Sequence, residues 1–262
     1  MKILVIGDSH LEIHSSIKRF KWLGDLILEE QPEVIVQIGD FVSLDCLSHW
    51  DYKHRARMEG KRYYAEIEKG NEALYLMELP MNKMNVFRSK NKKKQYKPRK
   101  IWHLGNHEER LNKYLEDRPE LIDSFNLPEE IGALGRGWEI IPYKEYSKVG
   151  NILFTHIPIN NANQPISGKY LCDKALSIHD TNVVFGHNHK LEFSTEARHG
   201  EDERLFALSV GCFIDGIPAY AAGGKGHKSW WRGVVMLDHM LDYENITDIK
   251  TISLERLRRD FG

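Results

Sequence analysis

The first ten residues, Met1-Lys2-Ile3-Leu4-Val5-Ile6-Gly7-Asp8-Ser9-His10, hold the pattern from which the rest of the architecture can be read. An apolar, β-branched run over residues 3–6 ends at a glycine and is followed at once by Asp8 and His10. This is typical of a buried strand in a parallel sheet that presents polar side chains at its carboxyl end. Because Asp8 and His10 lie two positions apart, an extended backbone directs both side chains to one side, where they can bind one metal ion.

The same pattern returns further along the chain. Residues 34–38 end at Gly39-Asp40, residues 101–104 at Gly105-Asn106-His107-Glu108, residues 151–155 at His156, and Asn182–Phe185 at Gly186-His187-Asn188-His189. His187 and His189 repeat the spacing of Asp8 and His10. The layout is that of strands that deliver ligands from their carboxyl ends, so we expect these side chains to converge.

A helix is predicted between the first two strands. Ser15 or Ser16 can cap its start, and Pro32 stops it. A strand, a helix and a strand in this order predict a β-α-β unit with parallel strands. The apolar positions that fall on one face of this helix are Ile17, Phe20, Leu23, Leu26 and Ile27.

The rest of the chain is predicted to add an insertion and a second sheet. Residues 48–100 form a long insertion with a helix over about residues 56–79 and a basic loop at residues 90–100. Short alternating strands follow at about residues 203–210, 233–237 and 246–252, and residues 190–262 are expected to complete a second sheet packed on the first. The sequence has no internal repeat or linker, so residues 1–262 are expected to form a single α/β domain.

Composition sets few limits on the substrate. The chain has 262 residues, and its formal net charge of −1 provides no global field that would draw it to nucleic acid or an anionic membrane. The odd number of cysteines, without a Cys-x-x-Cys pair, fits a reducing compartment. The first apolar run is too short for a signal peptide, and no later run approaches the roughly 20 residues of a membrane span. We therefore expect a soluble, cytoplasmic protein without membrane partners.

The ordered set of motifs resembles the calcineurin-like metallophosphoesterases over about residues 1–190. The segment Gly105-Asn106-His107-Glu108-Glu109-Arg110-Leu111, with Ser209-Val210-Gly211-Cys212 and Trp230-Trp231-Arg232-Gly233, is also similar to phosphoesterases encoded by bacteriophages. The resemblance implies a four-layer α-β-β-α sandwich, with two mixed sheets flanked by helices. It implies hydrolysis of a phosphomonoester or phosphodiester, preferably derived from a nucleotide or nucleic acid, by a hydroxide that bridges two divalent metal ions.

The resemblance also assigns ligands by residue. Asp8, His10 and His189 are expected to bind the first metal, Asn106, His156 and His187 the second, and Asp40 is expected to bridge both. A site of Asp, Asn and His without Cys suits manganese, with iron, zinc or nickel as alternatives.

His107 is the motif histidine that this assignment leaves outside both coordination spheres. In the family it contacts the phosphate and can protonate the leaving oxygen, so we expect a general acid; support for a ligand is the alternative. Glu108 is expected to be a carboxylate at a helix N-terminus or a support for a ligand. The arginines that clamp phosphate in Ser/Thr protein phosphatases are replaced here by Ser43-Leu44 and His103-Leu104, which argues against protein phosphatase activity. Asp45 either orients His107 or caps a turn.

Other residues are candidate substrate contacts beside Asn106 and His107. His49 and His54 begin the insertion soon after Asp40, with helix packing as the alternative. The basic segment 90–100 is either a steering surface for a polynucleotide or a solvated loop. A lid that stacks a base, or a set of buried aromatic residues, is predicted for His227, Lys228, Trp230, Trp231 and Arg232. Two rival functions remain open: a nuclease that acts on longer DNA or RNA strands, and a non-catalytic interaction scaffold on the same fold.

Overall fold

Alternation along the first strand, β1 (Lys2–Ile6), separates two apolar cores. Leu4 and Ile6 pack in a cluster with the helical residue Phe20, whereas Ile3 and Val5 pack in a cluster with strand residues from a second sheet. The computed structural model describes residues 1–49, 55–197, 204–239 and 247–262. A strand that is buried on both faces needs a layer on each side, and this requirement sets the architecture.

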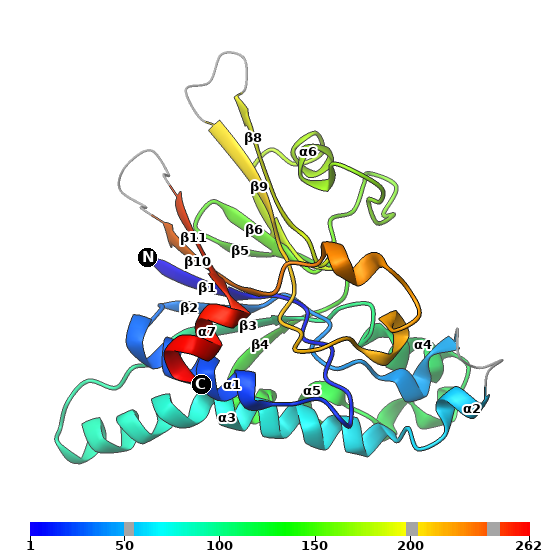
Figure 1. The fold of residues 1–262 in the computed structure, drawn as a ribbon, viewed down its shortest axis with the longest axis horizontal. Helices are drawn as coiled ribbons and strands as arrows, with labels where there is room; N and C mark the ends of the chain where they lie inside the picture. Colours follow the sequence, from blue (N-terminus) through cyan, green and yellow to red (C-terminus); the bar gives the residue numbers. More distant parts are fainter. Residues whose placement is uncertain (50–54, 198–203, 240–246) are drawn as a thin grey trace.

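The first sheet has six strands in the order β11-β10-β1-β2-β3-β4 (Figure 1). β1, β2 (Val34–Gln37), β3 (Arg99–His103) and β4 (Trp138–Ile141) are parallel. β10 (Gly233–His239) and β11 (Thr247–Ser253) extend the sheet antiparallel on the other side of β1. The helix α1 (Lys18–Glu30) connects β1 to β2, which confirms the predicted β-α-β unit.

The second sheet has five strands in the order β5-β6-β7-β9-β8. Their bounds are β5 (Ser147–Val149), β6 (Ile152–Thr155), β7 (Asn182–Phe185), β8 (Leu191–Ala197) and β9 (Arg204–Val210). β6, β7 and β9 are parallel, and β5 and β8 are antiparallel at the edges. One apolar cluster fills the space between the sheets, with Phe154 and Leu208 on one side and Val36 and Ile101 on the other.

Helices cover the outer face of each sheet (Figure 1). On the first sheet α1 contacts both α3 (Tyr63–Lys90) and α7 (Leu254–Phe261), while α6 (Leu171–Leu176) packs on the second sheet. The shorter helices are α2 (Arg55–Met58), α4 (Glu109–Glu116) and α5 (Leu127–Glu130). Helix, sheet, sheet and helix follow one another as layers, which confirms the predicted four-layer sandwich. Within the described residues, no helix combines the length and apolar character that a membrane span requires.

The expected second-sheet completion by residues 190–262 is partly wrong. β8 and β9 do belong to the second sheet, but β10 and β11 join the first sheet beside β1. Val234 and Met236 of β10 pack against the helices, while Val235 and Leu237 pack between the sheets. A strand that is apolar on both faces fits either sheet, so its residues alone could not decide the pairing.

The predicted helices also need correction. The long helix of the insertion begins at Tyr63 and continues through Pro80 to Lys90, instead of spanning residues 56–79. Its packing along α1 outweighs the local cost of the proline. The N-cap residue of α1 is Ile17, which makes no side-chain cap, while Oγ of Ser16 accepts the backbone N–H of Lys18, the first residue of the helix, at 3.4 Å.

Candidate metal centre

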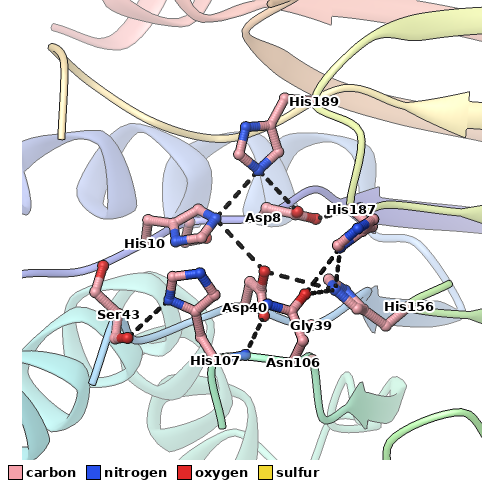
Figure 2. A network of polar contacts seen from close by, with 12 residues as sticks. Asp8, His10, Gly39, Asp40, Ser43, Asn106, His107, His156, His187 and His189 are labelled. Carbon is pink, nitrogen blue, oxygen red and sulfur yellow. Dashed lines mark hydrogen bonds and ion pairs between the residues drawn. The ribbon is translucent and has the colours of Figure 1, made fainter. Parts of the chain in front are cut away.

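The side chains predicted to bind metal come together where β1, β2, β3, β6 and β7 end (Figure 2). Several of these residues have left-handed backbone conformations, with φ of 43° at His10, 48° at Asp40, 68° at His187 and 59° at His189. Non-glycine residues rarely adopt this conformation, and it is concentrated at functional sites. The turns direct the side chains toward one another.

Asp8, His10 and His189 form the first group. The Nε2 atom of His189 lies 3.0 Å from Oδ2 of Asp8 and 3.1 Å from Nε2 of His10. All three residues are buried. Their facing oxygen and nitrogen atoms can bind one cation together.

Asn106, His156 and His187 form the second group. Oδ1 of Asn106 lies 3.1 Å from Nε2 of His156 and 2.8 Å from Nδ1 of His187. The two ring nitrogens are 3.3 Å apart. Nδ1 of His156 donates to the carbonyl oxygen of Ile38 at 3.0 Å, which leaves the lone pair of Nε2 directed into the site.

Asp40 lies between the two groups (Figure 2). Its Oδ2 atom is 3.6 Å from Nε2 of His10 in the first group and 3.5 Å from Nε2 of His156 in the second. Its other oxygen, Oδ1, accepts the backbone N–H of His107 at 2.8 Å, which fixes the orientation of the carboxylate. One oxygen therefore faces ligands of both groups.

The chemistry of these groups fits divalent metal ions. Oδ2 of Asp8 is buried, and apart from its 3.0 Å contact with Nε2 of His189 it accepts no hydrogen bond from any residue that the structure describes. Burial raises the pKa of the Asp8 carboxyl to about 6 and lowers the pKa of His187 and His189 to about 4. The imidazoles are therefore neutral at neutral pH. Their lone pairs face one another, and a cation bound between them would accept those lone pairs. Oxygen and nitrogen donors without thiolate suit manganese, iron, zinc or nickel.

Glu108 holds the two turns that carry the ligands. Its carboxylate accepts backbone N–H groups from Asp40 at 3.0 Å, Phe41 at 2.7 Å, Val42 at 3.1 Å and Gly105 at 2.7 Å. It thus supports the ligand turns without facing the site. Burial and the neighbouring Asp40 carboxylate raise the pKa of Glu108, while the hydrogen bonds from Val42 and Gly105 oppose that rise.

Two motif glycines are required by close approach. A Cβ atom on Gly186 would lie 2.5 Å from Oδ1 of Asp8, and one on Gly105 would overlap the Asp40 carboxylate. Any side chain at these positions would displace a ligand. The sequence Gly-Asn-His-Glu therefore contains a spatial requirement as well as chemical ones.

His107 stands beside the two groups. Its Nδ1 atom donates to the carbonyl oxygen of Ser43 at 2.7 Å, so its other nitrogen, Nε2, is the one available to a substrate. Its ring centroid lies 4.4 Å from that of His10. Burial lowers the pKa of His107 to about 4, an effect that Asp40 opposes.

Arg110 is a site residue that the sequence reasoning missed. It lies one helical turn after His107, and its guanidinium nitrogens are 2.7 Å from the Ser43 carbonyl oxygen and 3.3 Å from Nε2 of His107. The spacing of three residues on a helix that starts directly after the motif could have indicated it. Asp45 does not orient His107 directly; it pairs with Arg110 at 3.1 Å and with Lys61 at 3.1 Å.

The structure places only some of the predicted substrate contacts near the site. His49 lines a pocket together with Asn106, whereas His54 lies outside the described residues. The basic segment is not brought to the site, because it precedes β3 at its amino end while Asn106 follows the carboxyl end. Its last residue, Lys100, belongs to β3 and pairs with Glu78 at 2.8 Å.

The late aromatic residues form one wall of the site. The Trp230 ring lies 4.4 Å from that of His189, centroid to centroid, and Trp231 packs against the core between the sheets. Tyr220, which the sequence reasoning did not select, lies 5.2 Å from the His10 ring and 6.2 Å from Trp230. Its segment carries no motif that would have identified it.

Comparison with known proteins identifies the family of the chain. Residues 1–191 match the calcineurin-like phosphoesterase family. A zinc complex of wild-type Vps29 from Entamoeba histolytica is similar at 14% identity, with a TM-score of 0.39 over 97% of this chain and 99% of that chain. A second solved structure has 12% identity and a TM-score of 0.44 over 96% of this chain and 99% of that chain. No curated protein sequence matches the chain. The family match covers the five ligand-bearing turns from Asp8 to His189, and the chain therefore belongs to the calcineurin-like phosphoesterases.

Proposed function

We propose that this protein hydrolyses a phosphomonoester or phosphodiester at a centre of two divalent metal ions. The observation that carries the proposal is the position of Asp40, whose Oδ2 atom faces His10 at 3.6 Å and His156 at 3.5 Å. One carboxylate oxygen between two groups of donors is what a bridging ligand requires. When bound, the metal ions would act as Lewis acids on the phosphoryl oxygens and on the attacking water.

In this proposal, seven side chains bind the two metal ions. Asp8, His10 and His189 hold the first metal, Asn106, His156 and His187 hold the second, and Asp40 joins them. Manganese is the expected metal, because the donors are hard to borderline and no thiolate takes part.

His107 is proposed as the general acid. The hydrogen bond from Nδ1 to Ser43 leaves Nε2 free to exchange its contact with Arg110 for one with the leaving oxygen. The negative charge of a bound phosphate would favour the protonated imidazole, which can then give its Nε2 proton to that oxygen. Arg110, held by Ser43 and Asp45, would donate hydrogen bonds to oxygens of the bound phosphate.

A nucleotide or the end of a nucleic acid is the preferred substrate in this proposal. The aromatic wall of Tyr220 and Trp230 beside the first group of ligands is suited to stacking a base. A nuclease that follows longer strands is less well supported, because the basic segment 90–100 leads into the amino end of β3, opposite the end that Asn106 follows. A scaffold would not need these side chains, and none of the positions proposed as metal ligands has lost its Asp, Asn or His in this sequence.

Hydrolysis assays test the proposal. Wild-type protein with added manganese should cleave aryl phosphomonoesters or diesters, and Asp40→Asn should reduce kcat by at least about 10³-fold through loss of the bridging carboxylate. A surface variant, His14→Ala, serves as the control for handling and trace metal. Full activity in Asp40→Asn would rule out the bridging role.

Leaving-group dependence tests His107 separately. His107→Ala should reduce kcat by roughly 10²-fold for an alkyl ester, which needs protonation, and much less for a nitrophenyl ester, which does not. Equal losses for both esters would show that His107 acts on binding or orientation alone.

A further inference from the structure

A pocket of about 590 Å³ opens beside the candidate metal centre. Asn106 lines it at the end nearest the metal ligands, and Arg110, Lys113 and Arg118 line it along and just beyond α4. His49 lines it from the segment that follows β2. The pocket therefore continues outward from the position where a phosphate would be cleaved.

The pocket is positively charged. Asp117 is the acidic residue in its lining, against three cationic side chains. Arg110 is paired with Asp45, but in the described parts of the chain neither Lys113 nor Arg118 has an ion pair with a carboxylate. The Arg118 guanidinium lies over the Tyr114 ring at 4.1 Å from its centroid, which holds this cation at the wall. Three cationic side chains against one carboxylate in this lining favour an anionic ligand.

The position of the pocket suggests that the anion it binds is part of the leaving group. Nε2 of His107, the proposed proton donor, contacts Arg110 at 3.3 Å, so the leaving oxygen would lie at the mouth of the pocket. Lys113 follows Arg110 by about one helical turn, roughly 5 Å along the axis. A sugar attached to the leaving oxygen could span that distance and place its next phosphate between Lys113 and Arg118.

We propose that this pocket binds a second phosphate carried by the leaving alcohol, so that the preferred substrates have two phosphate groups. A nucleoside bisphosphate and the phosphorylated end of an oligonucleotide share this chemistry. The identification of the leaving side rests on the proposed function, whereas the preference of the pocket for a second phosphate can be measured without turnover.

Equilibrium binding in the presence of a chelator isolates the pocket from the metals. Isothermal titration calorimetry of the wild-type chain should show at least tenfold tighter binding of adenosine 3′,5′-bisphosphate than of adenosine 5′-monophosphate. A Lys113→Ala/Arg118→Gln double variant should reduce this preference below threefold. Arg259→Gln, an exposed cation on α7, is the matched control and should keep the preference. Equal affinity for both nucleotides, or no binding of either, would overturn the proposal.

Two further measurements are needed. The first distinguishes a mononucleotide from an oligonucleotide end as the source of the second phosphate, and the second distinguishes failure of the pocket proposal from failure of the proposed function. A trinucleotide with a terminal phosphate that binds tenfold tighter than the bisphosphate would identify an oligonucleotide end, and weaker binding would identify a mononucleotide. With manganese, the double variant should lose at least tenfold in kcat/KM for the bisphosphate and stay within twofold of wild type for an aryl phosphate. An inactive wild type with an intact binding preference would refute the proposed function alone, and equal losses on both substrates would refute the pocket.

Discussion

Under the proposed function, Arg110 would bind the phosphate from a position other than the one used by Ser/Thr protein phosphatases. Ser/Thr protein phosphatases carry arginines that clamp phosphate at two positions. In this chain those positions hold Ser43-Leu44 and His103-Leu104. Here a guanidinium arrives from one helical turn beyond His107 and is fixed by the Ser43 carbonyl at 2.7 Å and by Asp45 at 3.1 Å. A fork held by two acceptors loses little freedom when it binds phosphate.

We therefore expect Arg110→Ala to lower kcat by about tenfold to a hundredfold, the loss of one charge-assisted contact in the transition state. Metal content should be unchanged, because Arg110 is not among the ligands. Steady-state kinetics with elemental analysis of the same samples measures both quantities. Glu109→Gln, one position earlier on α4, is the control, and a normal kcat in Arg110→Ala would exclude the role.

Glu108 gives a second prediction at this scale. Glu108→Ala would leave four buried backbone N–H groups without their acceptor, those of Asp40, Phe41, Val42 and Gly105. We expect a loss of unfolding free energy on the order of 3 kcal/mol or more, measured by urea denaturation. Glu109→Ala, whose side chain contacts Asn112 at the surface, should change stability far less. A stable Glu108→Ala variant would mean that other groups hold the ligand turns.

The sequence indicated the side chains that converge at the candidate metal centre because their chemistry is local. Asp8 and His10, or His187 and His189, carry their spacing and their flanking glycine within a few residues. Arg110 could have been indicated by its three-residue spacing from His107. The contacts of Tyr220 and Asp45 depend on how separate segments pack, so no local pattern could reveal them. The glycines are intermediate: Gly105 is visible in the motif, but the carboxylate that excludes a side chain there comes from a different strand.

At the scale of elements, α3 is linked to the turn that carries Asp45 through a buried carboxylate. Glu66 of α3 accepts the backbone N–H of Asp45 at 3.3 Å. Burial, and secondarily the charge of Asp45, raise the pKa of Glu66 to about 7. The Lys61 ammonium pairs with Asp45 at 3.1 Å.

This shift predicts a pH-dependent stability. Because the pKa of Glu66 is higher in the folded chain than its usual 4.5, its contribution is fully present below about pH 4.5 and is lost as pH rises through about 7. The full effect is on the order of 3 kcal/mol. Urea denaturation at pH 5 and pH 8 should show a larger pH difference in wild type than in Glu66→Gln, which cannot ionise. The same pH difference in both proteins would contradict the assignment.

Helices and strands were predictable from the sequence where a whole segment is buried. Which strands pair with one another was not predictable. The apolar runs at β1, β2, β3, β6 and β7 follow from burial on both faces. The edge strands β4, β5 and β8 were missed, because partly exposed strands have weaker patterns. The first-sheet position of β10 and the passage of α3 through Pro80 both depend on neighbours that are distant in sequence.

At the scale of the whole molecule, the candidate metal centre draws its side chains from both sheets. Asp8, Asp40 and Asn106 follow strands of the first sheet, and His156, His187 and His189 follow strands of the second. Ions bound here would link the two halves of the sandwich and stabilise the folded state over the unfolded one.

Thermal unfolding should reflect that link. At a manganese concentration about 100-fold above Kd, linkage adds about 2.7 kcal/mol, so Tm should rise by roughly 5 °C or more over a chelated sample. Asp40→Asn should show a much smaller rise, and the exposed variant His14→Ala should match wild type. An identical Tm with manganese and with chelator would argue against metal ions at the sheet junction.

The pair of metal ions itself is tested most directly by anomalous X-ray scattering from crystals grown with manganese. The geometry around Asp40 predicts two manganese peaks about 3.5–4 Å apart, the spacing of two-metal sites, one beside His10 and His189 and the other beside His156 and His187. A single peak, or peaks that do not contact Asp40, would contradict a two-metal centre.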